Sequence, residues 1–152
     1  MNKFCKFFFI YLFITAFVNF LIFSEKKVNF GIKNLVYNKE NRIESEINKN
    51  LKNYKNLENK NKILDLQISS KAKKSTTSLD DRGDPKSFRL EIEVKIIVKK
   101  DNKSYPKEFY KSHDYNNSSN KFDLKKYENS IKKNLIGKIT EEIIVYILSL
   151  KI

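Results

Sequence analysis

Residues 88–100, FRLEIEVKIIVKK, decide the fold of this chain. Every second side chain from Phe88 to Val98 is apolar, and the positions between them are charged from Arg89 to Lys95. Alternation with a period of two is typical of a β-strand that has one buried face and one face in water. The segment therefore predicts a sheet whose apolar side is covered by another layer of structure.

The sequence on either side of this strand predicts two hairpins. Upstream, residues 63–72 alternate in the same way, and residues 75–87, STTSLDDRGDPKS, carry the Asp, Gly and Pro of a turn. Downstream, residues 101–104, DNKS, predict a second turn, and residues 105–115 predict a partner strand. Pro106 near the start of that strand predicts an edge position or a bulge, because proline has no N–H to donate to a central ladder.

A strand and a helix are predicted before these hairpins. Residues 25–37 alternate through Val28, Phe30 and Ile32, which indicates a first strand. Residues 38–60 then place apolar side chains three or four positions apart, the spacing of one stripe on a polar helix. That stripe consists of Ile43, Ile47, Leu51 and Tyr54.

The longest periodic segment lies at the C-terminal end. From Phe122 onward the helical period continues for almost the whole remaining chain, and Asn120 with Asp123 resembles a capping box. The predicted apolar spine is Leu124, Tyr127, Ile131, Leu135, Ile139, Ile143, Tyr146 and Leu150. Gly137 is unfavourable inside a helix, and it predicts close approach to a neighbouring element.

The predicted element order is β-α-β-β-β-α, and it implies one domain over residues 25–152. The order favours an α+β fold, a two-layer sandwich in which two helices cover one face of a four-stranded sheet. We expect the sheet to be antiparallel throughout. Its second face should be wet and carry charges of both signs.

The N-terminal segment, residues 1–24, is predicted to be a signal or anchor segment. Two lysines precede an almost entirely apolar run at residues 7–23. This run is long for the core of a signal peptide and slightly short of the about 20 residues that span a bilayer. It ends at Phe23 without the small residues of a cleavage site, so we expect an apolar helix that is retained as a membrane anchor.

The sequence offers no pattern typical of catalysis or of a metal site, so we predict a protein that is not an enzyme and has no cofactor. His113 is the only histidine, and we expect it to lie on a strand face. The acids Asp80, Asp81 and Asp84 do not follow the spacing of a calcium loop, and they indicate a turn instead. The single cysteine, Cys5, excludes a disulfide within the chain.

Charge points to an anionic partner. Lysine and arginine exceed the acids so far that the net charge is +13, which favours polyanions or anionic lipid surfaces. The predicted hairpin over residues 71–86 carries cations on a Ser/Thr-rich tip, and we expect Lys73, Lys74 and Arg82 to contact phosphate groups there. A lysine-rich but merely solvated loop is the alternative. Nucleic acid is a third possible partner. It is the least favoured, because nucleic acid is scarce where an exported protein acts.

The C-terminal segment resembles a known family, the lipopolysaccharide-assembly lipoprotein E (LptE/RlpB-like) family in its alphaproteobacterial form. Residues 115–148 resemble the family's turn and closing helix, and the step from Gly83 to Leu90 resembles its hairpin. The matching positions are Tyr115-Asn116, Phe122, Tyr127-Glu128, Asn134-Leu135, Ile139 and Ile143-Ile144. The resemblance covers roughly residues 28–151.

This resemblance implies a non-enzymatic role in lipopolysaccharide assembly. Members lie at the periplasmic side of the outer membrane as a plug inside a large β-barrel partner, and they can bind lipopolysaccharide directly. The resemblance also implies the two-layer fold that the periodicity predicts. For this chain we therefore expect a β-barrel assembly protein and lipopolysaccharide as partners, with Lys73, Lys74 and Arg82 as lipopolysaccharide contacts.

One departure from the family leaves the anchoring open. Family members carry a lipidated Cys directly after the signal peptide, whereas the corresponding region here, around residues 17–20, has none. The alternative is an inner-membrane protein anchored by residues 4–23, whose periplasmic domain binds another anionic partner such as lipid headgroups.

Overall fold

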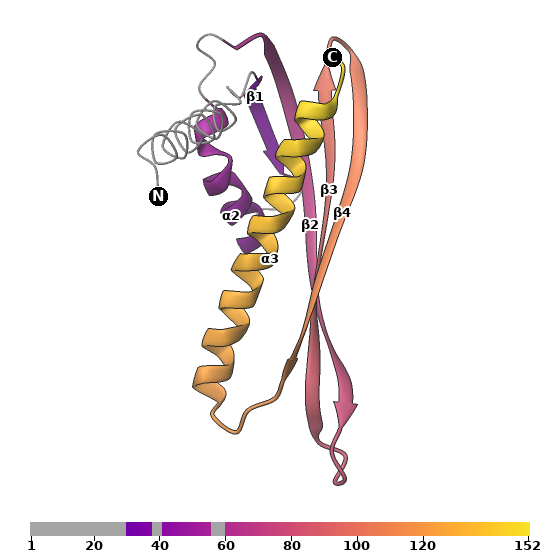
Figure 1. The fold of residues 1–152 in the computed structure, drawn as a ribbon. Helices are drawn as coiled ribbons and strands as arrows, with labels where there is room; N and C mark the ends of the chain where they lie inside the picture. The colour runs from indigo at the N-terminus through magenta and orange to yellow at the C-terminus, as the bar shows by residue number, and fades with distance from the viewer. Residues whose placement is uncertain (1–29, 38–40, 56–59) are drawn as a thin grey trace, which may run out of the picture.

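The computed structural model describes residues 30–37, 41–55 and 60–152 (Figure 1). Its elements follow the predicted order. They are β1 (Phe30–Tyr37), α2 (Arg42–Asn50), the 3-10 turn η1 (Lys52–Tyr54), β2 (Lys62–Leu79), β3 (Pro85–Lys100), β4 (Lys103–Asn116) and α3 (Lys121–Ser149). The predicted apolar helix of the leader and Val28 lie outside the described residues.

The sheet contains four strands in the order β1-β2-β3-β4, but it is mixed, so the prediction of an antiparallel sheet is wrong. β1 runs parallel to β2, with Phe30 opposite Lys62 and Tyr37 opposite Ile68. The other two pairs are antiparallel. A helix separates β1 from β2 in the chain, and such a crossover allows neighbouring strands to run in the same direction.

Both helices lie on one face of the sheet, so the predicted two-layer α+β fold is confirmed (Figure 1). The alternating residues of β3 are buried from Leu90 to Val98, facing the helices. From α3 they meet Ile139, Ile143 and Ile147, none of which is exposed. Complete burial of so many branched aliphatic side chains is the main source of stability for a fold without disulfides.

The caps of both helices are asparagine side chains. The Asn41 carboxamide oxygen accepts hydrogen bonds from the backbone N–H groups of Ile43 (2.8 Å) and Glu44 (3.1 Å). At α3 the Asn120 oxygen accepts from the N–H groups of Phe122 and Asp123, as the capping box predicted. Each cap satisfies two amide donors that have no partner within the helix.

Three predictions about the helices need correction. The helix predicted over residues 38–60 ends at Asn50, and Tyr54 lies instead in η1, where its ring stacks on Phe30 at 5.0 Å between centroids. Gly137 does not mark a close contact, because a Cβ atom built there would meet nothing within 4 Å. Tyr127, predicted to belong to the buried spine of α3, is half exposed.

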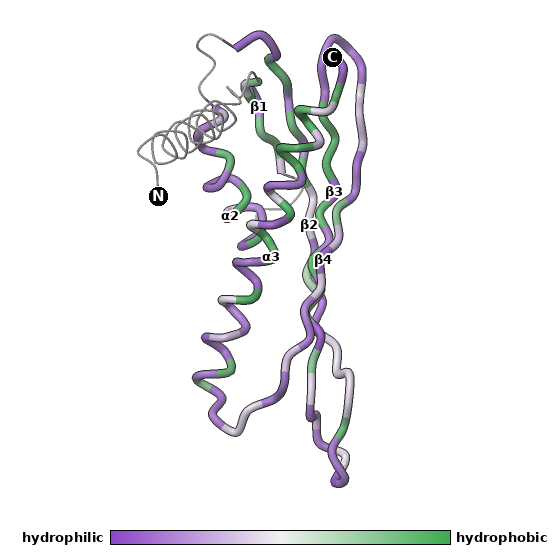
Figure 2. The backbone as a smooth tube through the Cα atoms, viewed as in Figure 1, coloured by the Kyte–Doolittle hydropathy of each residue, from purple (hydrophilic) through white to green (hydrophobic). Residues whose placement is uncertain are grey.

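The β2–β3 hairpin is longer than predicted. Residues 75–87 do not form a flexible loop, because the strands pair as far as Leu79 opposite Pro85 and leave only Asp80–Asp84 as the turn. Serine and threonine, which suggested a loop, are also compatible with an exposed strand. The hairpin projects beyond the start of α3 (Figure 1), and Figure 2 shows that its end is mostly hydrophilic.

The turn between β3 and β4 is shorter than the four residues predicted for it. Lys100 pairs with Lys103, and only Asp101 and Asn102 form the loop, both with positive φ. A two-residue loop of this conformation matches the twist of the strands that it joins. β4 is an edge strand, as Pro106 predicted.

Candidate functional site

The structure does not gather the three predicted lipopolysaccharide contacts at one place. Lys73 and Lys74 are neighbours within β2, so their side chains project from opposite faces of the sheet. Arg82 lies in the turn between β2 and β3. The prediction that all three cations share a hairpin tip is therefore wrong: only Arg82 is at the tip.

Lys73 is on the wet face and Arg82 is held within its own turn. Lys73 is exposed and lies opposite Glu91 of β3, but its side chain makes no hydrogen bond or ion pair with any residue that the structure describes. The Arg82 guanidinium lies 3.6 Å from the Asp80 carboxylate and 4.0 Å from that of Asp84. Two nearby carboxylates reduce the net charge that the tip presents to a ligand.

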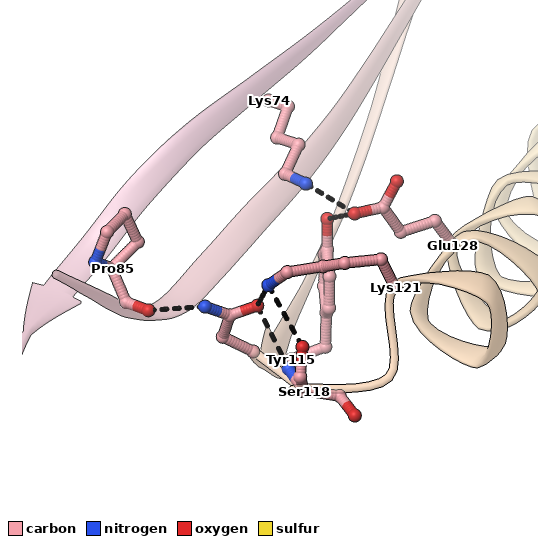
Figure 3. A network of polar contacts seen from close by, with 7 residues as sticks. Lys74, Pro85, Tyr115, Ser118, Lys121 and Glu128 are labelled. Carbon is pink, nitrogen blue, oxygen red and sulfur yellow. Dashed lines mark hydrogen bonds and ion pairs between the residues drawn. The ribbon is translucent and has the colours of Figure 1, made fainter.

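Lys74 belongs to a polar network on the helix-facing side of the sheet (Figure 3). Its ammonium group donates to the Glu128 carboxylate of α3, and the Tyr115 hydroxyl of β4 donates to the same oxygen at 2.8 Å. This network joins β2, β4 and α3 where the covered part of the sheet ends. Lys74 therefore has a structural partner rather than a free charge.

Aromatic rings enclose this network. The Lys74 ammonium lies over the Phe88 ring, 3.9 Å from its centroid, which is a cation–π contact. The Tyr115 ring contacts Phe88 at 5.7 Å and Tyr127 at 6.2 Å between centroids. Tyr127 thus packs edge-on against Tyr115 while half of it remains in solvent.

The network shifts the pKa of both acids within it. Burial opposes ionisation of Glu128, but the hydrogen bonds from Lys74 and Tyr115 outweigh it and lower the pKa of this carboxyl. Burial, followed by the hydrogen bond to Glu128, raises the pKa of the Tyr115 hydroxyl. At neutral pH the site therefore holds an ionised Glu128 carboxylate and a neutral Tyr115 phenol.

The sequence did not predict this network, although it contained a signal for it. Tyr115 and Glu128 are both positions that carried the family resemblance, at the end of the last strand and in the final helix. Their spacing along the chain gave no sign of contact, because the turn between them sets their distance. Lys74 was singled out as a cation without an indication that a carboxylate would hold it.

A second set of hydrogen bonds fixes the turn between β4 and α3 beside this network (Figure 3). The Asn117 side chain donates to the Pro85 carbonyl oxygen at 2.7 Å, and its backbone N–H donates to the carbonyl of Lys86 at 2.8 Å. The Lys121 ammonium donates to the Asn117 side-chain oxygen and to the Ser118 carbonyl, both at 3.0 Å. The start of α3 is thereby fastened to the first two residues of β3, directly after the hairpin turn.

The opposite, wet face carries paired charges, as predicted. Arg89 donates two hydrogen bonds to Asp114, at 2.6 and 2.8 Å, and Lys95 donates to Glu108 at 2.6 Å. Because both pairs are exposed, they contribute little to stability. His113 is an exposed residue of β4, as expected for a strand position.

Neither a metal centre nor a membrane-spanning helix is found in the described part of the chain. No three His, Cys, Asp or Glu side chains among residues 30–37, 41–55 and 60–152 are grouped as a metal site would need. Within the same ranges, no helix combines the length and apolar character needed to cross a bilayer. The Asp80 carboxylate instead accepts hydrogen bonds from the backbone N–H groups of Arg82 and Asp84. These bonds form the turn that the sequence predicted.

Known structures of the same fold come from bacterial lipoproteins. Rare lipoprotein B from Shewanella oneidensis aligns with a TM-score of 0.64 and 17% identity, over 78% of this chain and 94% of its own. A lipoprotein B from Nitrosomonas europaea, described as uncharacterized, aligns with a TM-score of 0.59 and 14% identity, over 79% of this chain and 85% of its own. A putative lipoprotein from Caulobacter crescentus aligns with a TM-score of 0.52 and 11% identity, over 75% of this chain and 85% of its own.

Comparison at the level of sequence finds no match, since no family model and no curated protein matches the chain. The structural matches nevertheless extend over nearly the whole of the rare lipoprotein B chain. The resemblance predicted from the C-terminal motifs is therefore confirmed in three dimensions: this chain has the fold of the LptE/RlpB-like lipoproteins.

Proposed function

We propose that this protein is a non-enzymatic lipopolysaccharide-assembly factor. It acts at the periplasmic side of the outer membrane, as plug and partner of a large β-barrel. The observation that carries the proposal is the match to rare lipoprotein B, which covers 94% of that chain. The ordered set of C-terminal motifs supports the same family independently of the structure.

The projecting β2–β3 hairpin is the proposed lipopolysaccharide contact. Lys73 and Arg82 expose their charged groups to solvent, and each can donate charge-assisted hydrogen bonds to the phosphates of lipid A. Lys74, the third predicted contact, would act chiefly by holding the hairpin to Glu128 of α3. The exposed Leu79 gives the same hairpin an apolar group for the acyl region of the ligand.

Capture of partners from cell envelopes tests the assembly role. The tagged full chain is purified from envelopes under mild detergent, and its partners and mature N-terminus are identified by mass spectrometry. Recovery of a large outer-membrane β-barrel protein is the expected result. Recovery with inner-membrane proteins alone, with residues 1–23 intact, would contradict the proposal.

That second outcome defines the alternative function. A periplasmic domain anchored in the inner membrane by residues 4–23 would bind a different anionic partner, such as lipid headgroups. The observation that favours it is the lack of a cysteine directly after the apolar segment, the residue by which lipoproteins are acylated. Fractionation of inner and outer membranes distinguishes the two functions in the same experiment.

The ligand contacts have a separate test. The double variant Lys73→Glu/Arg82→Glu should weaken lipopolysaccharide binding and leave the circular dichroism spectrum unchanged. Lys74→Gln serves as the comparison, because it should lower stability more than it lowers binding. Unchanged binding in the double variant would overturn the assignment of the hairpin.

A further inference from the structure

A groove between the two helices forms a second cationic region, separate from the hairpin. It is lined by Arg42, Ser45 and Glu46 of α2 and by Asn129, Lys132 and Lys133 of α3. The two helices lie side by side in Figure 1, on the side of the sheet away from the wet face. The groove thus belongs to the helical layer.

Two of the cations in this groove have no counter-charge. Glu46 is engaged by Lys133, with 4.0 Å between the ammonium and the carboxylate. In the described parts of the chain, neither Arg42 nor Lys132 forms an ion pair or a side-chain hydrogen bond. Three cations against one acid leave the groove with an excess of positive charge.

Lys132 also occupies an unfavourable position for a cation. Its side chain is partly buried, and this burial lowers the pKa of its ammonium, as do the positive charges of Arg42 and Lys125. Like charges held together without an acid destabilise a fold. A bound anion would remove that repulsion.

The distribution of charge along α3 adds to this positive excess. Its first half carries Lys121, Lys125, Lys126, Lys132 and Lys133 against only two acids, Asp123 and Glu128. Glu128 is already paired with Lys74. The half of α3 that lines the groove is therefore net cationic, which favours an anionic ligand.

We propose that the groove between α2 and α3 binds a phosphate monoester. The Arg42 guanidinium can grip two phosphate oxygens with parallel hydrogen bonds, and Lys132 supplies a second, compact charge. Ser45 and Asn129 can donate to the remaining oxygens. The backbone amides at the start of α2 take no part, because Asn41 already caps them.

This site does not depend on the proposed function, although a phosphate of lipid A belongs to the same chemical class. Its residues come from the helices, whereas Lys73 and Arg82 come from the hairpin. Loss of the groove therefore leaves the hairpin intact. Failure to recover a β-barrel partner would overturn the assembly role and leave the groove unaffected.

Isothermal titration of the full chain in a neutral detergent tests the proposal. Glycerol 3-phosphate probes a soluble monoester, and micelles that contain phosphatidic acid or phosphatidylglycerol probe a lipid monoester and a lipid diester. The site variant is Arg42→Gln/Lys132→Gln. The matched control is Lys126→Gln/Lys138→Gln, which removes the same charge from exposed positions of α3 outside the groove.

The expected result is that the site variant weakens monoester binding at least about tenfold, the loss of roughly one charge-assisted contact. The control variant should bind within about twofold of the wild type. Binding of glycerol 3-phosphate indicates a soluble source. Binding of phosphatidic acid alone, with the same dependence on the site variant, indicates a lipid source.

Three results would overturn the proposal: no binding of any monoester, equal binding of the diester lipid, or equal weakening in both variants. The last two would indicate attraction to the overall positive charge. If the site variant does not fold, an NMR titration of the wild-type protein still tests the proposed site. Glycerol 3-phosphate should then shift the NMR signals of the Arg42 and Lys132 side chains, and unshifted signals would exclude the site.

Discussion

The two ends of the β2–β3 ladder share one pattern of hydrogen bonds but differ in what covers them. Near β1, Leu66 lies opposite Val98, and both are buried beneath the helices. Near the turn, Thr76 lies opposite Phe88, and every residue of β2 beyond Ser75 is exposed. Strand pairing therefore extends the hairpin, while helix packing determines which part of it is stable.

The boundary between these two regions is the network at Tyr115. On one side α3 covers the sheet, and on the other the end of the β2–β3 hairpin extends beyond the start of α3 (Figures 1 and 2). Lys74, Glu128 and Tyr115 join the two regions where the cover ends. This arrangement gives a helix-covered sheet from which the end of the β2–β3 hairpin projects.

The largest effect is expected from the covered region. Ile139→Ala removes a side chain that has no exposure, and it should lower the free energy of unfolding by about 2–5 kcal/mol through lost burial and a cavity. Urea unfolding followed by circular dichroism measures the change. A loss below about 1 kcal/mol would show that α3 is not the element that stabilises the sheet.

The junction should show an intermediate effect. Tyr115→Phe keeps the ring and removes the hydroxyl that donates to Glu128, so it should cost about 1.5–3 kcal/mol, as for other hydrogen bonds to charged groups. The unfolding free energy of this variant, compared with that of Tyr105→Phe, measures the contribution of the network. Equal values would mean that the network does not couple the two regions.

The network also predicts a dependence on pH. Because the pKa of Glu128 is lowered in the folded state, its stabilising effect is present above the ordinary carboxyl value of 4.5 and is lost as the pH falls through the lower folded value. Glu128→Gln should therefore lose less stability than the wild type between pH 7 and pH 3. An identical loss in both proteins would remove Glu128 from the acid response.

Two glycines should respond in opposite directions. Gly137→Ala should stabilise α3 by about 1 kcal/mol, because the site has open space and alanine is the better helix former. Gly83→Ala should destabilise the hairpin turn by about 1 kcal/mol, because its φ of +85° disfavours a side chain. Thermal melts of both variants check the signs.

The smallest effect is expected at the hairpin tip. Leu79 is 59% exposed, so Leu79→Ser should change the free energy of unfolding by no more than about 0.5 kcal/mol. The same urea titration used for Ile139→Ala provides the comparison. A large loss at Leu79 would mean that the tip packs against another part of the molecule.

Much of this fold could be predicted because its elements have strong periods. The alternation from Phe88 to Val98 and the helical period after Phe122 each specify one element and one buried face. The parallel pairing of β1 could not be predicted from such patterns, because strand direction depends on how the intervening helix returns the chain. The length of the hairpin was missed because serine and threonine suit both loops and exposed strands.

The candidate site was harder to predict than the fold. Lys73, Lys74 and Arg82 were grouped by closeness in the sequence, but adjacent strand residues face opposite ways and the turn lies several residues further on. The contact of Tyr115 with Glu128 depends on how α3 lies across β4. A local sequence pattern does not specify how α3 crosses β4. Contacts between residues that are distant in the sequence can therefore be identified only from the three-dimensional structure.

Hydrogen–deuterium exchange of the full chain in neutral detergent, with and without lipopolysaccharide, tests the central claim most directly. Without ligand, the amides of the covered strands around Leu66 and Ile96 should exchange far more slowly than those of residues 76–87. Lipopolysaccharide should slow exchange in residues 71–87. Equal protection along the whole ladder, or a hairpin whose exchange lipopolysaccharide leaves unchanged, would contradict the account.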